Sequence, residues 1–131
     1  MRHEPELSFG FYFNAMVVAM AVFFLWIPEY LPMIDLPQHA AQVSLFIELM
    51  KGQSSFADIV EVNYLTPYWI GYGPLALLTC FFGIVTSVKI FLSIVFLAFY
   101  GSVYHFFKAI RTPPQLAILT LPSFFGFSFE W

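Results

Sequence analysis

Three polar side chains with complementary chemistry lie close together in the sequence, at Asp35, His39 and Gln42. A carboxylate near the start of a helix can take a proton from a hydroxyl group or help to hold a divalent cation. His39 and Gln42 follow one and two helical turns later, so both can reach the same ligand. This spacing makes Asp35 a candidate catalytic base and makes His39 and Gln42 candidate substrate contacts. We assign no metal ligand.

Structural roles compete with this interpretation. Asp35 could simply cap the helix that follows it, and His39 could be solvated or hydrogen-bonded without a function. The other nearby acids, Asp58 and Glu61, do not follow a metal-binding spacing. The cofactor is therefore unknown from the sequence, apart from the divalent cation that Asp35 could help to hold.

These candidate residues belong to a polar loop over residues 28–64, in which five acids accompany a single base, Lys51. Within the loop, residues 37–50 are predicted to form an amphipathic helix, because Pro37 suits a first helical turn and Lys51-Gly52 provides a stop. Its apolar stripe recurs every three or four residues and consists of Ala40, Val43, Ile47 and Met50. Such a helix lies on a membrane surface or against other helices. Residues 53–63 should return as an irregular segment.

The chain around this loop is apolar enough to need a membrane. Of its 131 residues, 60% are hydrophobic and 10% are charged, against about 25% charged in soluble domains. Apolar runs at residues 9–27, 65–85 and 90–107 can each cross a bilayer, and a partial span follows at 115–131. Asn14 should bond a neighbouring helix, and a polar turn at 86–89 should separate the second and third spans. We therefore predict an all-α integral membrane fold with three to four transmembrane helices.

Several classes of function are disfavoured by the composition. The net charge of −3 and the scattered basic residues exclude an electrostatic hold on nucleic acid. The sequence contains no P-loop, HExxH, GxSxG or CxxC motif, and Cys80 has no second cysteine with which to form a disulfide. No predicted span carries a central charge, which argues against a transporter fragment.

The order of these segments resembles the N-terminal part of the GT-C glycosyltransferases, polytopic membrane enzymes that take sugars from polyprenyl-phosphate donors. The likeness consists of one span, a large first loop with an acid near its start, and two short stretches, DLPQHAAQ at residues 35–42 and LPSFFGF at residues 121–127. The resemblance implies that Asp35 activates an acceptor hydroxyl for attack on the anomeric carbon of the sugar while the lipid phosphate leaves. It also implies a cytoplasmic N-terminus and an extracytoplasmic first loop. Many members carry an acidic pair at this site, whereas here Leu36 follows Asp35, so the resemblance does not extend to a metal site.

Two functions are therefore carried forward. The leading hypothesis is the N-terminal portion of a membrane glycosyltransferase, in which residues 1–131 form a single membrane domain and a fragment of a larger multi-pass protein of the bacterial inner (plasma) membrane. Its partners would be the lipid bilayer and a lipid-linked sugar donor, with no nucleic acid. The alternative is a small non-catalytic accessory subunit that packs against a membrane-protein partner through Gly71 and Gly73.

Overall fold

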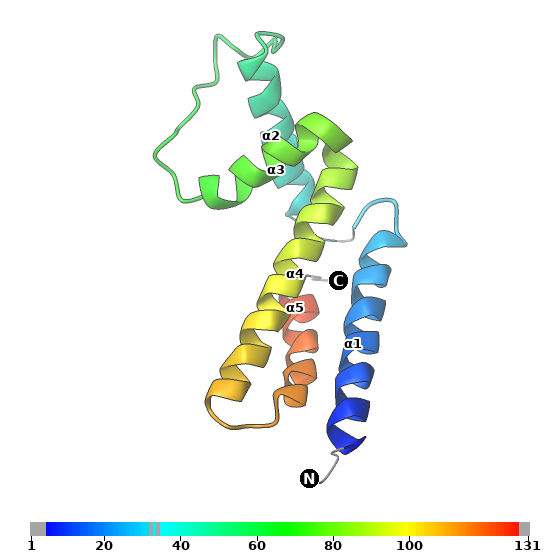
Figure 1. The fold of residues 1–131 in the computed structure, drawn as a ribbon. Coiled ribbons are helices and arrows are strands. Elements are labelled where there is room, and N and C mark those ends of the chain that lie inside the picture. The colour runs from blue at the N-terminus through cyan, green and yellow to red at the C-terminus, as the bar shows by residue number, and fades with distance from the viewer. Residues whose placement is uncertain (1–4, 32, 34, 129–131) are drawn as a thin grey trace. The chain divides into compact units, whose positions relative to one another are not determined.

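The computed structural model describes residues 5–31, 33 and 35–128, and within these residues all regular structure is helical. The elements in chain order are α1 (Pro5–Trp26), α2 (Leu36–Met50), α3 (Trp69–Phe82), α4 (Ile84–Ala109), the 3₁₀-helix η1 (Pro114–Thr120) and α5 (Leu121–Ser128) (Figure 1). The chain divides into two compact units, which are described separately. The α1 unit comprises Met1–Leu31 with Leu92–Trp131, and the α2–α3 unit comprises Pro32–Phe91.

In the α1 unit, α1 and α4 run antiparallel (Figure 1), and side-chain hydrogen bonds join them. The Tyr100 hydroxyl donates to Asn14 Oδ1 at 2.8 Å, and Trp26 Nε1 donates to Ser93 Oγ at 3.2 Å. Asn14 is buried, and its amide nitrogen also donates to the Gly10 carbonyl one turn earlier. The predicted bond from Asn14 to a neighbouring helix is thus confirmed.

The core of the α1 unit lies where α1, α4 and the C-terminal helices meet. Its buried members are Val18 and Ala21 of α1, Phe96 of α4, and Leu121 of α5. Phe124 places its ring edge-on to Phe96, with centroids 5.1 Å apart.

The first element of the α2–α3 unit agrees with the sequence prediction. The helix predicted over residues 37–50 is confirmed as α2, with Pro37 in its first turn. It ends at Met50 because Gly52 adopts a left-handed conformation, φ 65°, and closes the helix with two backbone hydrogen bonds: Gly52 N–H to the Leu49 carbonyl and Gln53 N–H to the Glu48 carbonyl. Val43, from the predicted apolar stripe, is fully buried.

The second helix of this unit is shorter than predicted. Residues 65–85 were expected to form one long span, but α3 occupies only Trp69–Phe82. At its start, the side chains of Asn63 and Thr66 accept hydrogen bonds from the backbone N–H groups of Leu65 and Tyr68, which holds this segment in turns. At its end, Gly83 has φ 73° and ψ 159°, a conformation that only glycine adopts without strain.

The turn predicted over residues 86–89 is also wrong, because these residues lie inside α4. The buried Ser87 hydroxyl donates to the Gly83 carbonyl one turn earlier, at 2.6 Å, so the polar side chain is satisfied within the helix. The chain instead changes direction at Gly83, between α3 and the first turns of α4 (Figure 1).

One helix in the described part of the chain, α4 at Ile84–Ala109, is long and apolar enough to cross a membrane. It extends beyond both ends of the span predicted at 90–107. Shorter apolar stretches occur at Gly10–Trp26 of α1 and Trp69–Phe82 of α3. The partial span predicted at 115–131 is divided between η1 and α5, and its last three residues lie outside the described residues.

Candidate functional site

The candidate base, Asp35, lies at the N-cap position of α2, and its side chain is exposed. Its backbone carbonyl accepts the His39 N–H at 3.1 Å, which starts the helix. Its carboxylate makes no capping hydrogen bond to the first turn. The capping role that competed with catalysis is therefore not seen in the described structure, and the carboxylate is accessible to a ligand.

The other two candidates, His39 and Gln42, are brought together by a residue of α3. His39 Nδ1 and the Tyr72 hydroxyl form a hydrogen bond of 2.6 Å, and the same hydroxyl donates to Gln42 Oε1. The imidazole and phenol rings lie 5.7 Å apart. The structure therefore groups His39, Gln42 and Tyr72 into one hydrogen-bonded set, which we call the His39 triad, while Asp35 lies one turn earlier, at the N-cap of α2.

Tyr72 was missed by the sequence analysis. It lies 33 residues beyond His39, and a pattern confined to one helix does not reveal a contact between two helices. The only signal in the sequence was the presence of several aromatic residues at the start of the predicted second span, which include Tyr68, Trp69 and Tyr72.

Aromatic packing holds α3 against α2 and thereby positions Tyr72. Trp69 lies edge-on to Phe46 of α2, with centroids 4.9 Å apart, and its indole N–H donates to the Asn63 carbonyl at 3.1 Å. Tyr68 stacks on Tyr72 with an interplanar angle of 20°. Such ring pairs add about 0.5–1.5 kcal/mol each beyond the area that they bury. The Phe46–Trp69 pair joins the two helices, and the Tyr68–Tyr72 stack supports the Tyr72 ring from the start of α3.

The electrostatics of the His39 triad favour a protonated tyrosine. Burial raises the pKa of the Tyr72 hydroxyl above its ordinary value, and the neighbouring Tyr68 hydroxyl raises the pKa further. The Tyr72 hydroxyl therefore keeps its proton at neutral pH and acts as a hydrogen-bond donor to Gln42.

The described residues do not provide a ready-made metal site. Among them, no group of three or more His, Cys, Asp and Glu side chains is arranged to hold a metal ion. The divalent cation suggested by Asp35 therefore gains no ligand set from the described part of this chain.

Comparisons of the chain with protein-family models, with curated proteins and with solved structures find no match. Two features of the described residues bear on function: the accessible Asp35 carboxylate, one helical turn before the His39 triad, and the exposed apolar side chains of the helices.

Proposed function

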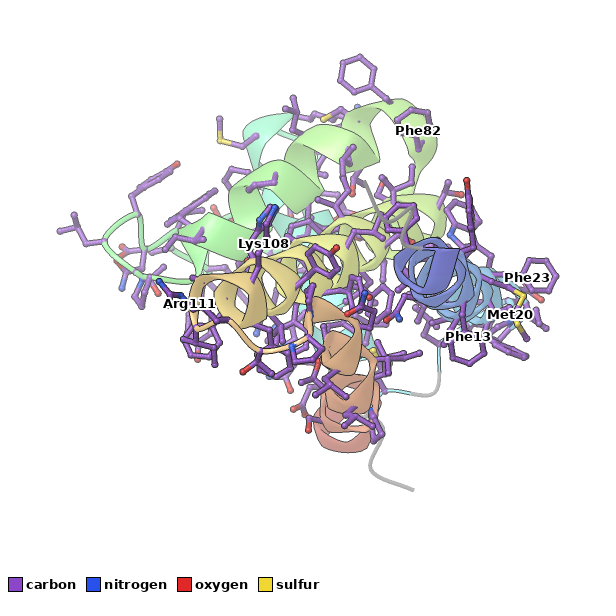
Figure 2. The ribbon with its side chains drawn as sticks, turned by 60° about the horizontal axis from the view of Figure 1, so that its bottom comes forward. Phe13, Met20, Phe23, Phe82, Lys108 and Arg111 are labelled. Atoms are coloured by element: carbon purple, nitrogen blue, oxygen red, sulfur yellow. The ribbon has the colours of Figure 1, made fainter. Side chains whose placement is uncertain are left out.

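We propose that the chain crosses a membrane more than once, through α1 and α4. An α-helix rises 1.5 Å per residue, so the 26 residues of α4 extend about 39 Å, against a hydrocarbon thickness of about 30 Å. The apolar stretch of α1, Gly10–Trp26, extends about 26 Å, which corresponds to the short end of the range of about 17–25 residues for transmembrane helices. Large apolar side chains of α1 are exposed, and Figure 2 shows Phe13, Met20 and Phe23 projecting from the helix on one side. Water would disfavour so large an apolar face, whereas lipid covers it.

In this proposal α3 lies along the membrane surface instead of crossing it. Its 14 residues extend only about 21 Å. One side of the helix exposes Ile70, Leu77 and Phe81, with exposed fractions of 84%, 64% and 74%, while Leu75 and Ala76 on the opposite side are buried. A helix too short to cross the hydrocarbon core can instead rest with its exposed apolar side in the interfacial region of a bilayer. Asp35 and the His39 triad would then lie at the boundary between lipid and water.

We further propose that the chain is the N-terminal portion of a membrane glycosyltransferase. The observation that carries this proposal is the exposed Asp35 carboxylate, which makes no capping bond and precedes the His39 triad by one helical turn. In the reaction, the carboxylate accepts the proton of an acceptor hydroxyl. The hydroxyl oxygen then bonds to the anomeric carbon of the sugar, and the bond to the lipid phosphate breaks, so the phosphate leaves with the electron pair. A lipid-linked donor fits a site at the membrane boundary.

The proposal is tested by Asp35→Asn in the natural protein that contains this chain. The substitution keeps the size of the side chain but removes its ability to take a proton, so sugar transfer in a membrane assay should fall by about 10²-fold or more. Glu48→Gln, the same chemical change at an exposed position further along α2, is the matched control and should leave transfer and membrane insertion unchanged. Transfer that survives Asp35→Asn would refute the catalytic role.

The accessory-subunit alternative keeps one supporting observation, the apolar outer side of α1, which could pack against another membrane protein. Contacts of such a partner with Gly71 and Gly73 stay a prediction; a side-chain carbon added at Gly71 would lie 4.0 Å from Phe91, and one added at Gly73 would lie 3.8 Å from Trp69.

The intact mass of the protein purified from its own membranes separates these two functions. A mass close to 15.1 kDa would favour the accessory subunit, because the enzyme needs further spans. A much larger mass would favour the glycosyltransferase.

A further inference from the structure

The hydrogen bonds of the His39 triad have a direction that determines where His39 carries its proton. A tyrosine hydroxyl has one hydrogen to donate, and the hydroxyl of Tyr72 donates it to Gln42 Oε1. The Tyr72 oxygen can then only accept the bond that it shares with His39 Nδ1, whose length is 2.6 Å. With this orientation of the Gln42 amide, His39 Nδ1 carries a hydrogen.

A neutral imidazole carries a single N–H, so a hydrogen on Nδ1 leaves Nε2 with an unshared electron pair. The bond that one ring nitrogen makes determines the chemistry of the other in this way at many histidine sites. Within the described residues, Nδ1 is the ring atom of His39 for which the structure gives a hydrogen-bond partner. The side chain is half-buried, and it lies one helical turn from the exposed Asp35.

We infer that Tyr72 is a positioning residue, which holds neutral His39 in the Nδ1–H form so that Nε2 accepts a hydrogen bond from a hydroxyl group of the ligand. This inference rests on the proposed function in one respect, that the ligand is the hydroxyl-bearing acceptor beside Asp35. Its structural part, the proton position on His39, is independent of any activity. The triad thus assigns His39 to binding a hydroxyl, and leaves the proton transfer to Asp35.

If the hydrogen bonds of the triad ran in the opposite direction, His39 would carry its proton on the other ring nitrogen. If the amide group of Gln42 were rotated by 180°, its nitrogen would donate to Tyr72, Tyr72 would donate to His39 Nδ1, and the hydrogen of His39 would lie on Nε2. The two arrangements differ in their response to Gln42→Glu, because a carboxylate can only accept. Gln42→Glu preserves the inferred arrangement but is incompatible with the reversed one.

The test is ¹⁵N NMR of the full chain in detergent micelles with ¹⁵N-labelled histidine, about two pH units above the ordinary histidine pKa of about 6.5. Long-range ¹H–¹⁵N correlations distinguish a protonated ring nitrogen from an unprotonated one, and His39→Asn identifies the signals of His39. We expect the Nδ1–H form in the native chain and in Gln42→Glu. Tyr72→Phe should lose this preference and show a mixture of both forms.

Tyr68→Phe is the matched control, because it removes a hydroxyl from the ring stacked on Tyr72 without altering the bonds of the triad. It should leave the His39 signals in the Nδ1–H pattern. An Nε2–H pattern in the native chain, or a tautomer that changes in Gln42→Glu, would overturn the inference, and neither result depends on how well Tyr72→Phe folds.

The functional part is tested in the natural protein that contains this chain. Tyr72→Phe should raise the KM for the acceptor about tenfold and change kcat less, which is the pattern expected when a contact made in the ground state is lost. An unchanged KM would refute the binding role. If NMR shows the Nδ1–H form of His39 but Asp35→Asn still transfers sugar, the proton position on His39 is supported and the proposed glycosyltransferase function is refuted.

Discussion

The hydrogen bond from Tyr100 to Asn14 predicts a measurable energetic coupling between α1 and α4. Tyr100→Phe removes the donor and leaves Asn14 Oδ1 without it in a site where Asn14 is only 5% exposed. Leaving a buried acceptor unpaired costs about 1–3 kcal/mol. Hydrogen bonds between membrane helices are weaker on average, with couplings of about 0.6 kcal/mol and a maximum of about 1.7 kcal/mol, because the unfolded chain in the membrane finds other partners.

We therefore expect Tyr100→Phe to lower the free energy of unfolding by about 1 kcal/mol and the coupling between the two residues to be between about 0.5 and 1.7 kcal/mol. The coupling is obtained from a cycle of Tyr100→Phe, Asn14→Ala and the double variant. Unfolding is followed by tryptophan fluorescence as sodium dodecyl sulfate is added to mixed micelles. The bond from Asn14 to the Gly10 carbonyl lies within α1 and is unaffected by Tyr100→Phe.

Tyr104→Phe provides the control for this cycle, because Tyr104 lies one turn further along α4 and the centroid of its ring is 6.4 Å from that of Tyr100. It should change the free energy of unfolding by less than about 0.5 kcal/mol. A coupling below about 0.2 kcal/mol, or an equal loss in Tyr104→Phe, would show that the Asn14–Tyr100 bond does not hold α1 against α4.

Three further predictions concern the backbone and the membrane. Gly83→Ala should cost about 1–3 kcal/mol in the same unfolding assay, because φ 73° with ψ 159° is strained for alanine although nothing lies within 4 Å of the added carbon; a cost below about 0.5 kcal/mol would contradict this. Gly52 and Arg111 both have a left-handed backbone, with φ 65° and φ 59°. Gly52→Ala should therefore lower the free energy of unfolding by about 1 kcal/mol, and Arg111→Gly should raise it by about 1 kcal/mol; changes of the same sign would refute the reasoning. Cys80, exposed on α3, should react with a membrane-impermeant maleimide applied to both faces of a vesicle, whereas a cysteine placed at Leu97 in the middle of α4 should not; equal protection would mean that α3 crosses the bilayer.

The sequence alone was sufficient for the parts of the fold that depend on local interactions. The helix at Leu36–Met50 could be predicted because Pro37 favours its first turn and Gly52 ends it, and both effects act within a few residues. The apolar stretches of α1 and α4 could be recognised for a similar reason, since hydropathy depends only on the residues within each segment.

The boundaries of α3 could not be predicted from hydropathy. Residues 65–85 contain no charged residue, but the side chains of Asn63 and Thr66 hold the segment before α3 in turns, and Gly83 separates α3 from α4. Polarity was equally misleading at Ser87, where the hydroxyl bonds to a carbonyl of its own helix and no turn forms.

For the candidate site, the sequence determined the spacing of Asp35, His39 and Gln42 along one helix, because helical geometry is periodic. The tertiary structure alone decided which of these side chains have partners. Tyr72 is separated from His39 and Gln42 by 33 and 30 positions in the sequence, and Tyr100 is separated from Asn14 by 86. Contacts of this range depend on how two helices pack, and the packing depends on the shapes of many side chains together. A local pattern in the sequence therefore does not reveal which helices pack together or which side chains meet.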